Sequence, residues 1–184
     1  MPVNYSSLSE LEAGIDPIID APPDTGVLSM IVRRPAVGER ETVDSADLDF
    51  AEGLIGDGWR SRTRSGPGET PDPSTQITVM NARAIALIAG EMNRWPLAGD
   101  QLYVEFDIGE DNLPAGTRVA IGEAVIEVSS QPHTGCRKFS QRFGVDALRF
   151  VNSEAGRKLR LRGLNARVVV PGTIRRGDAV SKQP

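Results

Sequence analysis

Turn-forming residues divide this chain into short segments. The sequence holds 19 glycines and 13 prolines among 184 residues, about 17% of the chain where average usage is ~12%. Between them lie short β-branched or alternating runs, such as residues 27–33, 76–80 and 101–108, and only residues 82–91 and 136–151 show helical periodicity. Such spacing is typical of strands joined by turns. The sequence therefore predicts a β-rich mixed α/β fold, a barrel or sandwich with a few helical inserts.

The length predicts one domain with a short N-terminal extension. Hydrophobic residues make up 39% of the 184 residues and charged residues 25%, which is a globular composition. A chain of this size buries roughly 70% of its unfolded surface on folding, so it needs no crosslinks. Residues 1–24 contain four prolines and are predicted to form an arm, and residues 25–184 the domain. The polar segment 60–74, rich in glycine and proline, is predicted to be a long loop.

Several protein classes are disfavoured by the sequence. Its single cysteine excludes a disulfide within one chain. No apolar run approaches the ~18 residues of a membrane span, and the acidic N-terminus does not resemble a signal peptide. The pI near 5.1 is far from that of a typical nucleic-acid-binding domain. We therefore expect a cytoplasmic protein with neither a membrane nor a nucleic acid as partner, and predict nothing about its oligomeric state.

Charge is distributed unevenly along the chain. Residues 1–60 hold 12 acidic and 4 basic side chains, whereas residues 133–184 hold 3 acidic and 12 basic ones. One interpretation is that the C-terminal third faces an anionic ligand. The alternative is that the two ends of the chain neutralise each other across the fold.

The segment from Pro132 to Phe139 carries the strongest chemical signal. It contains the only histidine and the only cysteine of the chain, His133 and Cys136, where a strand is predicted to give way to a helix. Cys136 would then lie at a helix N-terminus, beside the cations Arg137 and Lys138. These surroundings favour a reactive thiolate.

Such a thiolate could act as a nucleophile, carry a persulfide sulfur or bind a metal. The alternative is that Cys136 packs as a small buried hydrophobic residue. His133 is equally consistent with a structural residue and with a proton donor. One cysteine and one histidine are too few nitrogen and sulfur ligands for a structural zinc site.

A second signal is the basic run from Gly156 to Arg167. If residues 158–162 form an extended strand, Lys158, Arg160 and Arg162 share one face and the intervening leucines share the other. A row of cations would suit a phosphate or another oxyanion. The alternative is a solvated edge strand that its charges protect from pairing.

Taken together and in order, several short motifs resemble the MOSC domain, named after the C-terminal part of molybdenum-cofactor sulfurases. The resemblance runs from about Thr25 to Val180. The segments that carry it are Gly53-Leu54-Ile55-Gly56-Asp57, Gln76-Ile77-Thr78-Val79-Met80, Gly99-Asp100-Gln101-Leu102, Asn112-Leu113-Pro114-Ala115-Gly116-Thr117, Pro132-His133-Thr134-Gly135-Cys136-Arg137-Lys138-Phe139, Phe143-Gly144, Pro171-Gly172-Thr173 and Gly177-Asp178. A small stand-alone bacterial member with a single MOSC-type β-barrel is what the resemblance implies.

The resemblance also implies a cofactor and a reaction. The signature cysteine of the family maps onto Cys136, which would be the thiolate ligand of molybdenum in a molybdenum–pterin cofactor. His133 would lie near the open site as a second catalytic residue. The residues expected to hold the anionic pterin are Arg137, Lys138, Lys158, Arg160, Arg162 and Arg167. The expected reaction is reduction of N-oxygenated small molecules, with electrons from a separate donor protein.

Two alternatives of other classes stay open at this point. In the first, Cys136 carries a persulfide received from a cysteine desulfurase and passes the sulfur to a metal cofactor. In the second, the protein is a non-catalytic binding module. Pyridoxal phosphate is not expected within this chain, because the large desulfurase domain of sulfurases has no counterpart here.

Overall fold

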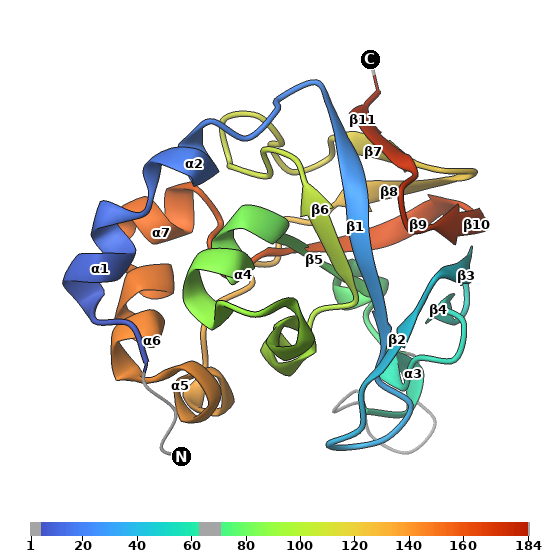
Figure 1. The fold of residues 1–184 in the computed structure, drawn as a ribbon. Coiled ribbons are helices and arrows are strands. Elements are labelled where there is room, and N and C mark those ends of the chain that lie inside the picture. Colours follow the sequence, from blue (N-terminus) through green and yellow to red (C-terminus); the bar gives the residue numbers. More distant parts are fainter. Residues whose placement is uncertain (1–4, 63–70, 184) are drawn as a thin grey trace.

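A closed seven-stranded β-barrel forms the centre of the molecule in the computed structural model, which describes residues 5–62 and 71–183 (Figure 1). Neighbouring strands follow the order β11-β7-β8-β9-β5-β6-β1, and β1 pairs back with β11 to close the barrel. Only β5 and β6 run parallel among these pairs. The strands are β1 (Thr25–Arg33), β5 (Ile77–Asn81), β6 (Leu102–Glu105), β7 (Arg118–Ile121), β8 (Ala124–Val128), β9 (Leu164–Val170) and β11 (Ala179–Lys182). The predicted β-rich fold is confirmed.

A smaller sheet packs against the barrel. It consists of β10 (Gly172–Arg175), β3 (Ser45–Asp49) and β4 (Gly53–Leu54), and β2 (Glu41–Val43) pairs with the end of β1. Ala46, Leu48, Leu54 and Ile174 of the small sheet are buried in the same cluster as the barrel interior. The small sheet therefore completes the inner core.

Strand alternation sorts the buried side chains into two cores. Leu102 and Val104 of β6 face the barrel interior, whereas Tyr103 faces the helices outside. Successive side chains of a strand point to opposite faces, so a strand covered on both sides buries all of them. In β1 the pairing with β6 shifts between Leu28 and Met30. This irregularity lets both Leu28 and Ile31 reach the interior, three positions apart.

Most of the helices gather on one side of the barrel (Figure 1). These are α1 (Leu8–Ala13), α2 (Asp16–Ile19), α4 (Ala82–Ala89), α5 (Arg137–Phe143), α6 (Val145–Asn152), α7 (Glu154–Lys158) and the 3-10 segment η2 (Met92–Ala98). The described part of the predicted arm forms α1 and α2, whose Leu11 and Ile18 are buried in the outer core. The boundary between arm and domain stays a prediction.

Two predicted elements need correction. The helical segment 136–151 is two helices, because Gly144 between them has φ +91° and ends α5. The predicted strand over residues 158–162 is wrong: Lys158 ends α7, Arg160 has φ +49°, and β9 starts only at Leu164. The intervening residues form a turn, so the alternating leucines and cations do not lie on two faces of a strand.

The predicted loop 60–74 is described only at its ends. Its start belongs to α3 (Trp59–Arg62) and its end to the 3-10 turn η1 (Pro73–Thr75). Residues 63–70 lie outside the described part of the chain.

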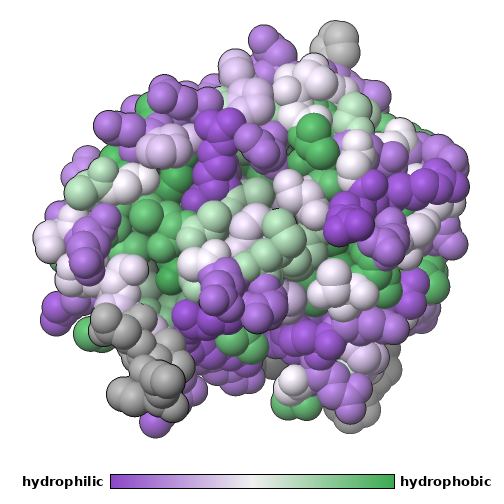
Figure 2. All heavy atoms as spheres, in the orientation of Figure 1, coloured by the Kyte–Doolittle hydropathy of each residue, from purple (hydrophilic) through white to green (hydrophobic). Residues whose placement is uncertain are grey.

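Polar side chains dominate the face shown in Figure 2, and its hydrophobic residues are exposed in separate patches. Within residues 5–62 and 71–183, no helix has both the length and the apolar character that crossing a bilayer requires.

Candidate functional site

A pocket of about 500 Å³ lies where the segment after β8 meets α6, α7 and the turn before β9. Its walls include His133, Arg160 and Arg162, three of the predicted site residues. Arg157 of α7 also lines it and was not among the predicted site residues. The structure therefore brings these cations together through a helix and a turn instead of along a strand.

A buried ion pair fixes Arg162, which lines the pocket, to Asp100, which does not. The Asp100 side chain is fully buried, and its Oδ2 accepts a hydrogen bond from Arg162 Nη1 at 2.5 Å. Arg162 Nη2 also donates to the carbonyl oxygen of Ala98 at 2.9 Å, and its guanidinium lies 5.1 Å from the centre of the Phe139 ring. With these contacts Arg162 is held in one position, and its charge is balanced by Asp100.

His133 lies directly beside this pair. Its Nδ1 is buried and lies 3.4 Å from Asp100 Oδ1, and only 17% of the side chain is exposed. Burial lowers the pKa of His133 to about 3, helped by the nearby cations Arg162 and Arg34 and opposed by Asp100. His133 is therefore an uncharged imidazole near neutral pH.

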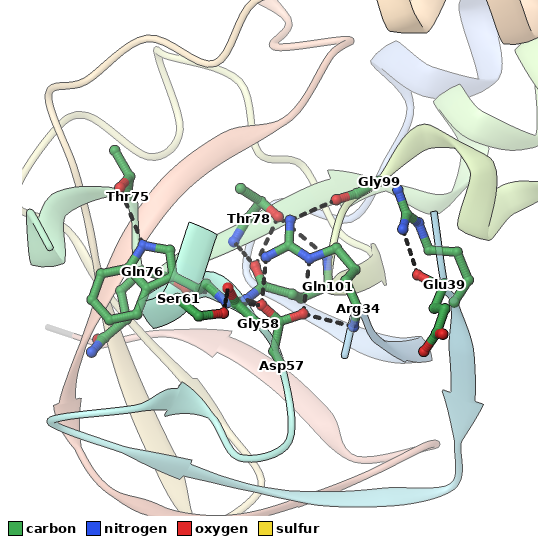
Figure 3. A network of polar contacts seen from close by, with 12 residues as sticks. Arg34, Glu39, Asp57, Gly58, Ser61, Thr75, Gln76, Thr78, Gly99 and Gln101 are labelled. Carbon is green, nitrogen blue, oxygen red and sulfur yellow. Dashed lines mark hydrogen bonds and ion pairs between the residues drawn. The ribbon is translucent and has the colours of Figure 1, made fainter. Parts of the chain in front are cut away.

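The segment that carries Asp100 is anchored by a second polar network (Figure 3). Arg34 Nη1 donates to the carbonyl oxygen of Gly99, while Arg34 Nε and Nη2 each lie 2.8 Å from an oxygen of the buried Asp57 carboxylate. On the other side, Gln101 Oε1 accepts from the backbone N–H of Thr78 at 2.7 Å. Asp100 is thus fixed from both neighbouring residues.

Cys136 is the exposed N-cap residue of α5, as predicted. It does not pack as a buried hydrophobic residue, and it does not itself line the pocket, whose wall on this segment ends at Thr134. Asn152 fixes the preceding peptide: the Gly135 N–H donates to Asn152 Oδ1 at 2.9 Å, and Asn152 Nδ2 donates to the Gly135 carbonyl oxygen at 3.2 Å. This two-bond clamp holds Cys136 at the rim of the pocket, next to the segment of His133.

The family model of the MOSC domain matches residues 70–181. The chain belongs to the MOSC domain family. The matched range contains the whole candidate site, from Asp100 through His133 and Cys136 to Arg162. The family is associated with binding of the molybdenum cofactor. No curated protein matches the chain.

Solved structures support the MOSC fold. The YUAD protein from Bacillus subtilis superposes with a TM-score of 0.62 at 18% identity, covering 86% of this chain and 97% of that one. YiiM from Escherichia coli gives a TM-score of 0.56 at 20% identity over 86% and 70% of the two chains. YiiM from Geobacillus stearothermophilus gives 0.58 at 15% identity over 87% and 75%. At these identities the likeness shows the fold.

The remaining predicted cations of this MOSC chain lie outside the pocket or are already engaged. Arg137 and Lys138 are exposed beside Cys136 and do not line the pocket. Lys158 Nζ lies 3.1 Å from Asp111, and Arg167 Nη2 lies 2.6 Å from Glu127 on the neighbouring strand. Arg160 lines the pocket while donating to the carbonyl oxygens of Ile108 and Leu113.

Acidic residues of the middle of the chain neutralise several of the C-terminal cations. Several cations beyond residue 133 pair with acidic residues of the middle segment, namely Asp100, Asp111, Glu123 and Glu127. The pair of Arg176 with Asp44 joins the first 60 residues to the last 52. Arg157 has no partner among the described residues and is exposed at the pocket, which favours the interpretation that this part of the chain faces an anion.

Proposed function

We propose that this MOSC protein binds an anionic molybdenum–pterin cofactor, with Cys136 as the thiolate ligand of molybdenum. The observation that carries the proposal is the placement of an exposed cysteine, held by the Asn152 clamp, at the rim of a pocket lined by Arg157, Arg160 and Arg162. Thiolate is a ligand that soft or high-valent metals accept, and guanidinium groups bind phosphate through paired hydrogen bonds.

The residues present suit such a group. The unpaired Arg157 is available for a phosphate, and Arg162 Nε is buried at the pocket without a hydrogen-bond partner. Arg160 adds a positive charge to the pocket wall. Glu110 lies on the same wall and partly offsets this charge. Arg137 and Lys138 would contact only a ligand that extends past the rim. Lys158 and Arg167 would have to leave their carboxylate partners to contribute.

When bound, molybdenum would supply two-electron redox chemistry suited to the reduction of N-oxygenated small molecules. The residues of this chain bind and orient: Cys136 anchors the metal, and the arginines fix the anionic end of the cofactor. His133, being uncharged near neutral pH, offers a hydrogen-bond acceptor and not a cationic proton donor. A separate electron donor is part of the proposal.

Metal analysis of protein made in a host that synthesises the cofactor tests this function. We expect stoichiometric molybdenum in the wild-type protein and its loss in Cys136→Ser, with an unchanged circular dichroism spectrum because the side chain is exposed. Gln141→Ala, at an exposed position of the same helix α5 and outside the pocket, is a matched control and should retain the metal. Absence of molybdenum from the folded wild-type protein would contradict the proposal.

A sulfur-carrier function is the second candidate, favoured by the exposure of the free Cys136 thiol. The Cys136 thiolate would take the terminal sulfur of a desulfurase persulfide, whose own cysteine leaves as a thiolate. Intact-mass analysis after incubation with a cysteine desulfurase and cysteine would then show one added sulfur in the wild-type protein and none in Cys136→Ser. Finding neither metal nor sulfur would leave a non-catalytic binding module.

A further inference from the structure

We infer that Asp100 fixes His133 as a neutral hydrogen-bond acceptor, and that the pocket consequently selects ligands carrying a hydrogen-bond donor beside an anionic oxygen. The inference deepens the proposed function, on whose pocket it rests. Its test requires no molybdenum, so its failure and that of the proposed function can be told apart.

The position of the imidazole determines which nitrogen carries the hydrogen. Nδ1 of His133 and Oδ1 of Asp100 are both buried, neither has a hydrogen-bond partner among the described residues, and they lie 3.4 Å apart. If Nε2 carried the hydrogen, two lone pairs would face each other in a buried site, which is unfavourable. With the hydrogen on Nδ1, a polar N–H faces the carboxylate instead. Asp100 is therefore a positioning residue for His133.

The side chains of Asp100 and His133 have little room to move, because Arg162 and Gly163 enclose them. Arg162 holds the other oxygen of Asp100 at 2.5 Å, so the carboxylate cannot rotate freely. A Cβ atom at Gly163 would lie 3.3 Å from both Asp100 Oδ1 and His133 Nδ1, so the backbone closes that side of the pair. The ring nitrogen left for a ligand is Nε2, on a side chain that lines the pocket.

Burial keeps His133 neutral, and the net effect of the charges that face it acts in the same direction. Asp100 and Arg162 balance each other, and Arg34 adds a further positive charge to the surroundings of the imidazole. Protonation would place a second positive charge beside Arg162 in a buried site. Nε2 is thus a lone-pair acceptor under physiological conditions.

The rest of the pocket attracts a negative charge. Arg157 and Arg160 oppose the single carboxylate of Glu110 on the same walls, which leaves an excess of positive charge. A ligand oxygen that is drawn to these guanidinium groups but carries no hydrogen would meet the Nε2 lone pair. A ligand group with its own O–H or N–H would satisfy it.

Hydrogen phosphate and sulfate provide matched probes, because at about pH 8 both are tetrahedral dianions and only phosphate retains an O–H. Equilibrium dialysis of the cofactor-free protein with each anion should give a dissociation constant for phosphate about tenfold lower than that for sulfate. His133→Phe should bring the ratio close to one. Arg157→Ala should weaken both anions together, and Arg175→Ala, on β10 and outside the pocket, should change neither.

The single histidine makes the acceptor directly observable. In protein labelled with ¹⁵N-histidine, the two ring nitrogens should report a neutral ring with hydrogen on Nδ1 and a lone pair on Nε2, and phosphate should shift the Nε2 signal more than sulfate does. Because this measurement uses the unmutated protein, it does not depend on whether a variant of the buried Asp100 would fold. A ring with hydrogen on Nε2, equal binding of the two anions, or binding of neither would overturn the inference.

Discussion

Gly163 shows how closely the backbone encloses the buried pair of Asp100 and His133. It has φ +106°, a conformation that disfavours any side chain. A Cβ atom there would lie 2.5 Å from the carbonyl oxygen of Val79 and 3.3 Å from both Asp100 Oδ1 and His133 Nδ1. Glycine is therefore required at this position both for its backbone conformation and for the space it leaves.

We predict that Gly163→Ala lowers the free energy of unfolding by about 1–3 kcal/mol more than Gly177→Ala does. Gly177 is a matched control, because it has φ +94° but no atom within 4 Å of an added Cβ. Urea denaturation of both variants measures the difference. Equal losses of unfolding free energy in the two variants would show that Asp100, His133 and the Val79 carbonyl can move aside.

At the scale of elements, the end of α6 fixes the segment that carries Cys136. Leu148, Val151 and Asn152 of this helix would all lie within 3.3 Å of a Cβ at Gly135. The close contact and the two hydrogen bonds of Asn152 leave the Gly135 peptide one arrangement. Cys136 owes its position to a helix that follows it in the chain, as well as to the helix that it caps.

Asn152→Ala should therefore reduce molybdenum retention as well as stability. Asn112→Ala is the matched control, because the Asn112 side chain also makes two hydrogen bonds to the backbone in another part of the molecule, Nδ2 donating to the carbonyl oxygens of Pro23 and Asp107. We expect both variants to lose about 1–3 kcal/mol of unfolding free energy. Only Asn152→Ala should lose bound metal, measured by elemental analysis of the purified protein, and equal retention would contradict the positioning role.

The sequence predicts these elements only where the signal is local. Asparagine favours helix N-caps, and Asn81 directly precedes the predicted helical segment 82–91; its Oδ1 accepts hydrogen bonds from the backbone N–H groups of Arg83 and Ala84. The strand prediction for the basic run was wrong because alternate spacing alone cannot distinguish a strand from a helix end followed by a turn. Here the turn contains Arg160 in a left-handed conformation.

Local sequence patterns could not predict which residues pair with each other at the site. Asp100 was not among the predicted site residues, yet it meets Arg162 across 62 positions of sequence. A signal was available, since an arginine predicted to lie near buried leucines needs a carboxylate partner. Which carboxylate supplies it depends on the parallel pairing of β5 and β6, which no short motif specifies.

At the scale of the whole molecule, His133 couples folding to pH. Its pKa in the folded protein is about 3, whereas an unfolded chain binds the proton near pH ~6.5. Below that pH the unfolded state holds more protons, so His133 makes the protein less stable as pH falls from about 6.5 toward 3, by at most ~1.4 kcal/mol per pH unit.

His133→Gln removes this contribution and leaves the carboxylates in place. We predict that the unfolding free energy of the wild-type protein falls more steeply than that of the variant between about pH 6.5 and 4.5. Urea denaturation at several pH values measures both slopes. Parallel curves would show that the folded protein accepts the proton as readily as the unfolded chain.

The central claim is that Cys136 and the arginine-lined pocket form one site, although the cysteine lies at its rim. The rate at which iodoacetamide alkylates Cys136, followed by intact mass, tests it most directly because the chain has no other thiol. Protein loaded with molybdenum cofactor should react much more slowly than cofactor-free protein, and removal of the cofactor should restore the rate. Equal rates at full molybdenum occupancy would contradict the account.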